Sequence, residues 1–101
     1  MDRSVSPLTP TAIINIVYDH MGCDVSLIKS KSRASELIVR PRQVAVYFLK
    51  RLTKLSLDQI GEKAGNIHHA TCIHSIKTVK NLMFSDKEFK AMIEELEGKL
   101  K

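Results

Sequence analysis

Residues 56–83 read SLDQIGEKAGNIHHATCIHSIKTVKNLM, and this stretch predicts how the rest of the chain is arranged. Ser56 followed three residues later by Gln59 is the pattern of a capping box, which begins a short helix. Gly65 predicts the end of that helix, because glycine adopts a left-handed conformation without steric cost. Two helices joined by such a turn form a helix-turn-helix, whose second helix presents its N-terminal end to a DNA major groove.

A second helix is predicted directly after the glycine, with Asn66 as its N-cap. Its apolar positions are spaced four, three and four residues apart, which places them on one helical face. These positions are Cys72, Ile76, Val79 and Met83. We expect this face to pack inward and the N-terminal end of the helix to remain exposed.

The exposed end carries side chains that are suited to reading DNA bases. A major groove presents donors, acceptors and thymine methyl groups in a distinct pattern for each base pair. Imidazole and hydroxyl groups can exchange hydrogen bonds with that pattern, and small methyl-bearing side chains can contact the thymine methyl. The predicted base-reading residues are His68, His69, Ala70 and Thr71.

Positive charge is concentrated in the middle of the chain. The 101 residues have a net charge of +5 and a pI near 9.4. Residues 29–54 contain eight basic residues and one acid, Glu36, so they carry +7 and leave −2 for the rest. This distribution indicates a face that binds a polyanion. Basic surface without such a partner is also common, and the sequence leaves that alternative open.

The segments before the basic region are predicted from caps and spacing. Residues 1–8 are expected to be a flexible lead-in, and residues 9–101 a single domain. Thr9 and Pro10 begin a helix that runs to about Met21 and is closed by Gly22. Its apolar run is rich in β-branched residues and is also compatible with a strand. One further helical turn is predicted over residues 25–28.

A third helix is predicted from Pro41 to about Thr53, and a last one follows a capping box that begins at Ser85. The inward face of the third helix is expected to contain Val44, Ala45, Phe48, Leu49 and Leu52. Its polar residues Arg42, Gln43, Lys50 and Lys54 are expected on one side of the opposite surface. That spacing suits contacts with DNA phosphates, although ordinary surface residues of a helix have the same pattern.

Two segments resemble the C-terminal DNA-binding domain of the bacterial replication initiator DnaA. RPRQVAVYFLKRLTKLSLDQIG (residues 40–61) is similar to that family's RPRQ helix and to the S-L-x-x-I-G opening of its helix-turn-helix. HHATCIHSIKTV (residues 68–79) is similar to the end of its signature GGRDHTTVLHAxRK. The resemblance extends over about residues 10–95. It implies a compact all-α domain of the Trp-repressor type that binds double-stranded DNA in replication initiation or its regulation.

The resemblance also implies where DNA is contacted. In the family, residues that match Arg42, Gln43 and Lys50 lie close to phosphates, and a loop that matches residues 29–35 reaches the minor groove through an arginine. Lys31 and Arg33 are the two candidates for that minor-groove role. The predicted phosphate-binding set is Arg42, Gln43, Lys50, Lys54 and Leu57.

The signature departs from the family at the predicted base-reading end. Ile67 stands where the family has arginine, His68 where it has aspartate and Ala70 where it has threonine. Only His69 and Thr71 keep their identity. These differences predict a changed or weaker sequence preference. They also support an alternative, a protein-interaction module or transcriptional regulator that kept the fold and lost the usual readout, with its last helix or Ile67 as an apolar contact.

Catalytic and cofactor-binding patterns are absent from the sequence. It has no G-x-x-x-x-G-K-[ST] phosphate loop, no G-x-S-x-G elbow and no paired CxxC. A metal site at His68, His69, Cys72 and His74 is not expected, because Cys72 belongs to the inward face and His74 points nearly opposite to it. We therefore predict a non-enzymatic, cofactor-free protein whose partner is duplex DNA.

The two cysteines and the hydropathy pattern suggest a cellular location. Cys23 and Cys72 are far apart in sequence and are read as reduced thiols. No apolar run approaches the ~20 residues of a membrane span, and the N-terminus lacks the apolar core of a signal peptide. A cytoplasmic protein associated with the nucleoid is the prediction.

Overall fold

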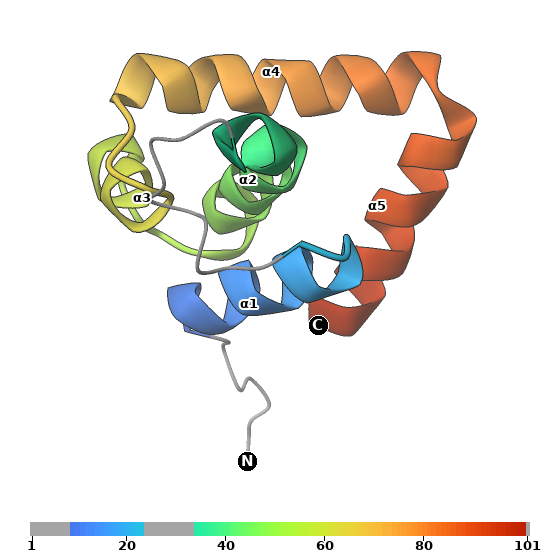
Figure 1. Ribbon diagram of the computed structural model, residues 1–101, viewed down its shortest axis with the longest axis horizontal. Helices are drawn as coiled ribbons and strands as arrows, with labels where there is room; N and C mark the ends of the chain where they lie inside the picture. The colour runs from blue at the N-terminus through green and yellow to red at the C-terminus, as the bar shows by residue number, and fades with distance from the viewer. Residues whose placement is uncertain (1–8, 24–33, 101) are drawn as a thin grey trace.

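The computed structural model describes residues 9–23 and 34–100, and the side chains of residues 9–23 and 39–100. These residues form helices and no strands, which confirms the predicted all-α class (Figure 1). The helices are α1 (Pro10–His20), α2 (Ala34–Leu52), α3 (Leu57–Lys63), α4 (His69–Ser85) and α5 (Lys87–Leu100). The predicted lead-in, the predicted turn at 25–28, and Lys31 and Arg33 all lie outside the described residues.

Helix α2 is the centre of the fold. In Figure 1 it is seen nearly end-on, with α1, α3, α4 and α5 arranged around it. Residues 44–49 are six consecutive buried positions. A helical segment that is apolar on all sides is typically enclosed by its neighbours. The sequence predicted only one inward face. Val46 and Tyr47 are buried as well, because α4 and the other surrounding helices cover them.

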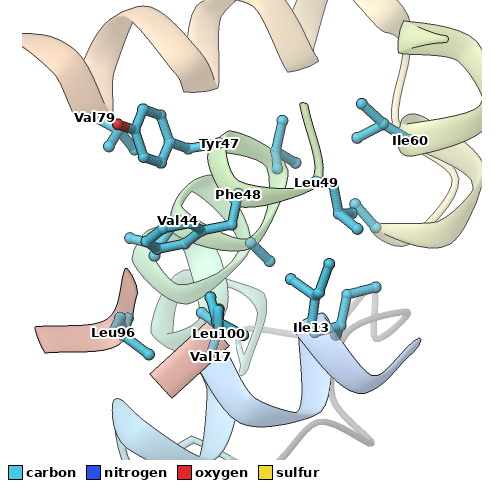
Figure 2. Close-up of a cluster of buried hydrophobic side chains, with 14 of the residues drawn as sticks. Ile13, Val17, Val44, Tyr47, Phe48, Leu49, Ile60, Val79, Leu96 and Leu100 are labelled. Atoms are coloured by element: carbon cyan, nitrogen blue, oxygen red, sulfur yellow. The ribbon is translucent and has the colours of Figure 1, made fainter. Parts of the chain in front are cut away.

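The core is aliphatic with a few aromatic rings. Side chains from all five helices converge on α2 (Figure 2). The Tyr47 and Phe48 rings meet edge to face, with centroids 5.1 Å apart. Leu52, predicted to be buried, is only partly so and packs at the edge of this cluster.

The start of α2 differs from the prediction. The helix begins at Ala34, and Pro41 lies inside it rather than in its first turn. Proline lacks the N–H that would bond to the carbonyl four residues earlier, but its fixed φ is close to the helical value. One hydrogen bond is therefore lost while the helix continues, and Pro41 itself is buried. The proline was misread as a start signal because it is most common there.

The other helix ends follow local capping chemistry. The Thr9 hydroxyl accepts a hydrogen bond from the Ala12 N–H at 3.1 Å, and Pro10 occupies the first turn of α1, as predicted. The predicted Ser85 cap of α5 is wrong. Asp86 Oδ1 accepts from the N–H groups of Glu88 and Phe89, whereas the Ser85 hydroxyl donates to the Asn81 carbonyl. Ser85 is therefore the last residue of α4 and not the cap of α5.

Within the described part of the chain, no helix is both long enough and apolar enough to span a membrane.

Candidate nucleic-acid interface

Helices α3 and α4 form the predicted helix-turn-helix. The Ser56 side chain accepts from the Gln59 N–H, and the Gln59 side chain accepts from the Ser56 N–H, which completes the predicted capping box. Gly65 has a φ of 113°, as its predicted left-handed role requires. The chain therefore reverses sharply after α3 and enters α4.

The predicted N-cap of α4 is wrong. Asn66 has a φ of 61°, so it belongs to the left-handed turn together with Gly65. Asparagine tolerates this conformation better than most residues because its short polar side chain interacts with the local backbone. His68 is the N-cap, and its Nδ1 accepts a hydrogen bond from the Ala70 N–H at 3.1 Å. Histidine was overlooked as a cap because Ser, Thr, Asp and Asn are preferred there.

Gly61 holds the turn against α3. The Ile67 N–H donates to the Gly61 carbonyl at 3.0 Å. A Cβ atom at Gly61 would collide with the carbonyl oxygen of Ile67, so this close backbone approach requires glycine. Ile67 is partly buried and packs against the core. The sequence marked Gly61 as part of a family motif but did not reveal this role.

Residues 68–71, which we call the α4 tip, are all exposed. Its two imidazole rings lie against each other, with centroids 4.2 Å apart. The Nδ1 of His69 is 3.3 Å from Oδ1 of Asp58 on α3. Asp58 was not among the predicted site residues, although an acid in the first turn of α3 is visible in the sequence.

Several polar atoms and methyl groups of the α4 tip are accessible to an external partner. His68 uses Nδ1 for the cap and His69 places Nδ1 beside Asp58, so each ring has its Nε2 available for an external partner. Thr71 makes no side-chain hydrogen bond within the described residues, and Ala70 exposes its methyl group. The tip can therefore offer ring nitrogens, one hydroxyl and methyl groups to a groove.

The inward face of α4 follows the predicted spacing. Cys72 and Val79 are fully buried, and Ile76 and Met83 are partly buried against the core. Burial raises the pKa of the Cys72 thiol, and the charge of Asp58 raises it further. The Cys72 Sγ lies 3.7 Å from the Leu57 carbonyl oxygen. Among the described residues, no group of three or more His, Cys, Asp or Glu side chains is placed to hold a metal ion.

The predicted phosphate-binding residues of α2 differ in direction and burial. Gln43 and Lys50 are seven residues apart on α2, so they point in nearly the same direction, whereas Arg42 is turned by about 80° from Lys50. Burial raises the pKa of Tyr18 on α1 to about 12, and the charge of nearby Arg42 offsets part of this rise. Arg42 is therefore near Tyr18 and partly buried, and its phosphate-binding role stays a prediction.

The remaining phosphate candidates differ in their surroundings. Lys50 and Lys54 are exposed, and Lys54 follows the end of α2. Gln43 accepts a hydrogen bond from Arg40. Leu57 is partly buried, and its carbonyl is near Cys72. Its side chain offers no donor to a phosphate, so only its backbone N–H at the start of α3 could serve.

Comparison with known proteins identifies the family of this helix-turn-helix. The family model described as the bacterial DnaA protein helix-turn-helix matches residues 10–79. The chain belongs to the bacterial DnaA helix-turn-helix family. This match includes α1, α2, α3 and the first eleven residues of α4, and therefore the whole turn and tip. Membership of this family supports DNA binding by the helix-turn-helix.

Individual relatives carry the name chromosomal replication initiator protein DnaA. The chain is 43% identical to the protein of Geobacter sp. strain M21 over 93 residues, which are 92% of this chain and 20% of that protein. It is 41% identical to that of Flavobacterium psychrophilum over 88 residues, or 87% of this chain and 18% of that protein. The chain thus spans about a fifth of the length of these relatives, in their C-terminal domain.

Proposed function

We propose that this chain binds double-stranded DNA in a sequence-dependent manner through the α4 tip, at a DnaA-box-like or related site, in replication initiation or its regulation. The observation that carries the proposal is the exposure of residues 68–71 at the N-terminal end of a helix whose opposite face is buried. A groove reader needs this combination, because the helix must be held firmly while its end remains accessible.

The proposal divides the contacts into two kinds. His68, His69, Ala70 and Thr71 read base edges, whereas Lys50 and Lys54 neutralise phosphates and fix the position of the protein. Arg42, Gln43, the Leu57 N–H, and Lys31 or Arg33 in the minor groove complete the proposed set. With about five phosphates neutralised, the logarithm of the binding constant falls with log salt at a slope near −4 to −5. A titration without salt dependence would contradict this.

Selection of bound sequences from a random duplex pool identifies the site, after which two variants test the division. Thr71→Ala is expected to reduce the preference for the selected site over random duplex by roughly 1 kcal/mol or more. Lys50→Ala is expected to weaken both duplexes alike. Equal losses on both duplexes for Thr71→Ala would remove the base-reading role of the tip.

No ATPase activity is proposed for these 101 residues, because they contain no phosphate loop. The full activity of the longer relatives is therefore not transferred to this chain.

A second candidate function is a contact with another protein. One observation favours it: Phe84, at the end of α4 beside α5, is 95% exposed. An aromatic ring so open to solvent is unusual and can anchor a partner. Phe84→Ser would then abolish partner binding and leave DNA affinity unchanged, which separates this function from the first.

A further inference from the structure

A pocket of about 240 Å³ lies where α4 passes across α2, well away from the α4 tip. Its lining residues are Tyr47, Lys50, Arg51, Ile76 and Lys80. The floor is formed by Tyr47, which is 7% exposed, and by the partly buried Ile76. The rim carries three cations from two helices. This α2–α4 pocket is therefore a concave site lined by positively charged side chains.

The cations of the pocket are not equivalent. Arg51 is paired with Glu97 of α5, at 3.1 Å between Nη2 and Oε2. Lys50 and Lys80 are exposed and form no ion pair within the described residues. Two lysines from different helices that line one small pocket repel each other unless an anion lies between them. The pocket is thus arranged for a ligand that carries at least one negative charge.

The position of Lys80 favours the DNA backbone as the source of that charge. Lys80 is eleven residues after His69, so it lies about 16 Å along α4 from its beginning. A major groove is about 8.5 Å deep. When the tip reaches the groove floor, Lys80 is therefore outside the groove, where it can meet the backbone but not the base edges. Lys50, a proposed phosphate contact, lines the same pocket.

We propose that the α2–α4 pocket is a phosphate clamp, in which Lys50 and Lys80 bind the same backbone phosphate of the duplex while Arg51 is held in place by Glu97. This inference rests on the proposed DNA-binding function and adds Lys80 to it as a phosphate-binding residue. The clamp links the central helix to the reading helix. It fixes the angle at which α4 enters the groove.

A set of variants tests the clamp by fluorescence anisotropy with a labelled random-sequence duplex at several salt concentrations. Lys50→Ala and Lys80→Ala are each expected to weaken binding several-fold. Because the two lysines share one phosphate, the double variant is expected to lower the steepness of the salt dependence by only about 0.9. Lys90→Ala, an exposed lysine on α5, is the matched control and is expected to bind like the unchanged protein.

Glu97→Gln is expected to change DNA affinity in the opposite direction. It removes a negative charge beside the pocket and is expected to tighten DNA binding, a result that structural damage would not produce. Thermal melting of each variant checks that it is folded.

The outcomes separate the clamp from the function on which it rests. If the unchanged protein binds no duplex, the proposed function fails. If it binds and Lys50→Ala weakens binding while Lys80→Ala does not, the clamp is wrong and the function stands. A double variant whose salt slope falls by about 1.8 would show two separate phosphates and would also overturn the clamp.

Discussion

Residues 44–49 of α2 are buried one after another, whereas residues 68–71 at the beginning of α4 are exposed one after another. The α2 segment is held by packing from the helices around it. The α4 tip is held by local polar contacts: the His68 side-chain cap, the backbone bond from Ile67 to Gly61 and the contact of His69 with Asp58. The difference shows how a small domain can keep side chains accessible and still fix their position.

The largest expected effect is on the buried segment. Phe48→Ala removes a fully buried ring from the centre of the core, and should lower the free energy of unfolding by about 3–5 kcal/mol. Urea denaturation followed by circular dichroism measures this. The DNA affinity of the molecules that remain folded should not change. A loss below about 1 kcal/mol would contradict the central role of α2.

The next effect concerns a polar atom inside the core. The Tyr18 hydroxyl is buried without a hydrogen-bond partner among the described residues, and burial is the main cause that raises its pKa to about 12. Since the folded pKa is above the unfolded value near 10, this contribution to stability is complete below about pH 10 and is lost as the pH rises through 12.

The variant Tyr18→Phe isolates the contribution of the Tyr18 hydroxyl to the pH dependence of stability. Between pH 10 and 12 the free energy of unfolding should fall more in the unchanged protein than in Tyr18→Phe, by on the order of 2 kcal/mol. Parallel urea denaturation curves at several pH values measure the difference. Identical pH profiles would show that Tyr18 does not titrate differently on unfolding.

Gly61→Ala tests whether the turn between α3 and α4 positions the α4 tip. The added Cβ meets the Ile67 carbonyl oxygen, so the turn must shift, at a cost of about 1–3 kcal/mol. Because the α4 tip moves with the turn, DNA affinity should fall by about tenfold or more, as measured by anisotropy. Gly98→Ala on α5 is the control, since nothing lies within 4 Å of its added Cβ. It should leave binding unchanged.

The smallest effect is expected at the cap itself. His68→Ala removes the acceptor for the Ala70 N–H and should cost about 1 kcal/mol of stability. His74→Ala, an exposed histidine on the same helix, has no capping role and should cost close to nothing. Thermal denaturation of the two variants checks this, and equal losses would show that the His68 cap contributes nothing.

Much of the fold was predictable because its signals are local. The Ser56 capping box, the Thr9-Pro10 start and the left-handed Gly65 each depend on residues within a few positions of one another. The all-α class and the inward face of α4 followed from periodic spacing. The family resemblance, confirmed by the match over residues 10–79, located the helix-turn-helix.

The errors arose where a residue has two uses. Proline begins helices but also fits inside them, so Pro41 gave the wrong start for α2. Asn66 is a good cap but also a good left-handed residue, and in the fold it takes the second role. The neighbours of Arg42 and Lys50 depend on how α1 and α4 pack around α2, which spacing alone does not show. The roles of the DNA-contacting residues remain predictions.

The role of the α4 tip is tested most directly by a nitrogen-15 NMR titration of the chain with a duplex recovered by selection. We expect the largest chemical-shift changes at the amides of residues 68–71, followed by Lys50 and Lys80, with little change in the core residues of α1. If the largest changes instead fall on α5 and the amides of the α4 tip do not move, the assignment of the tip as the DNA-reading element is contradicted.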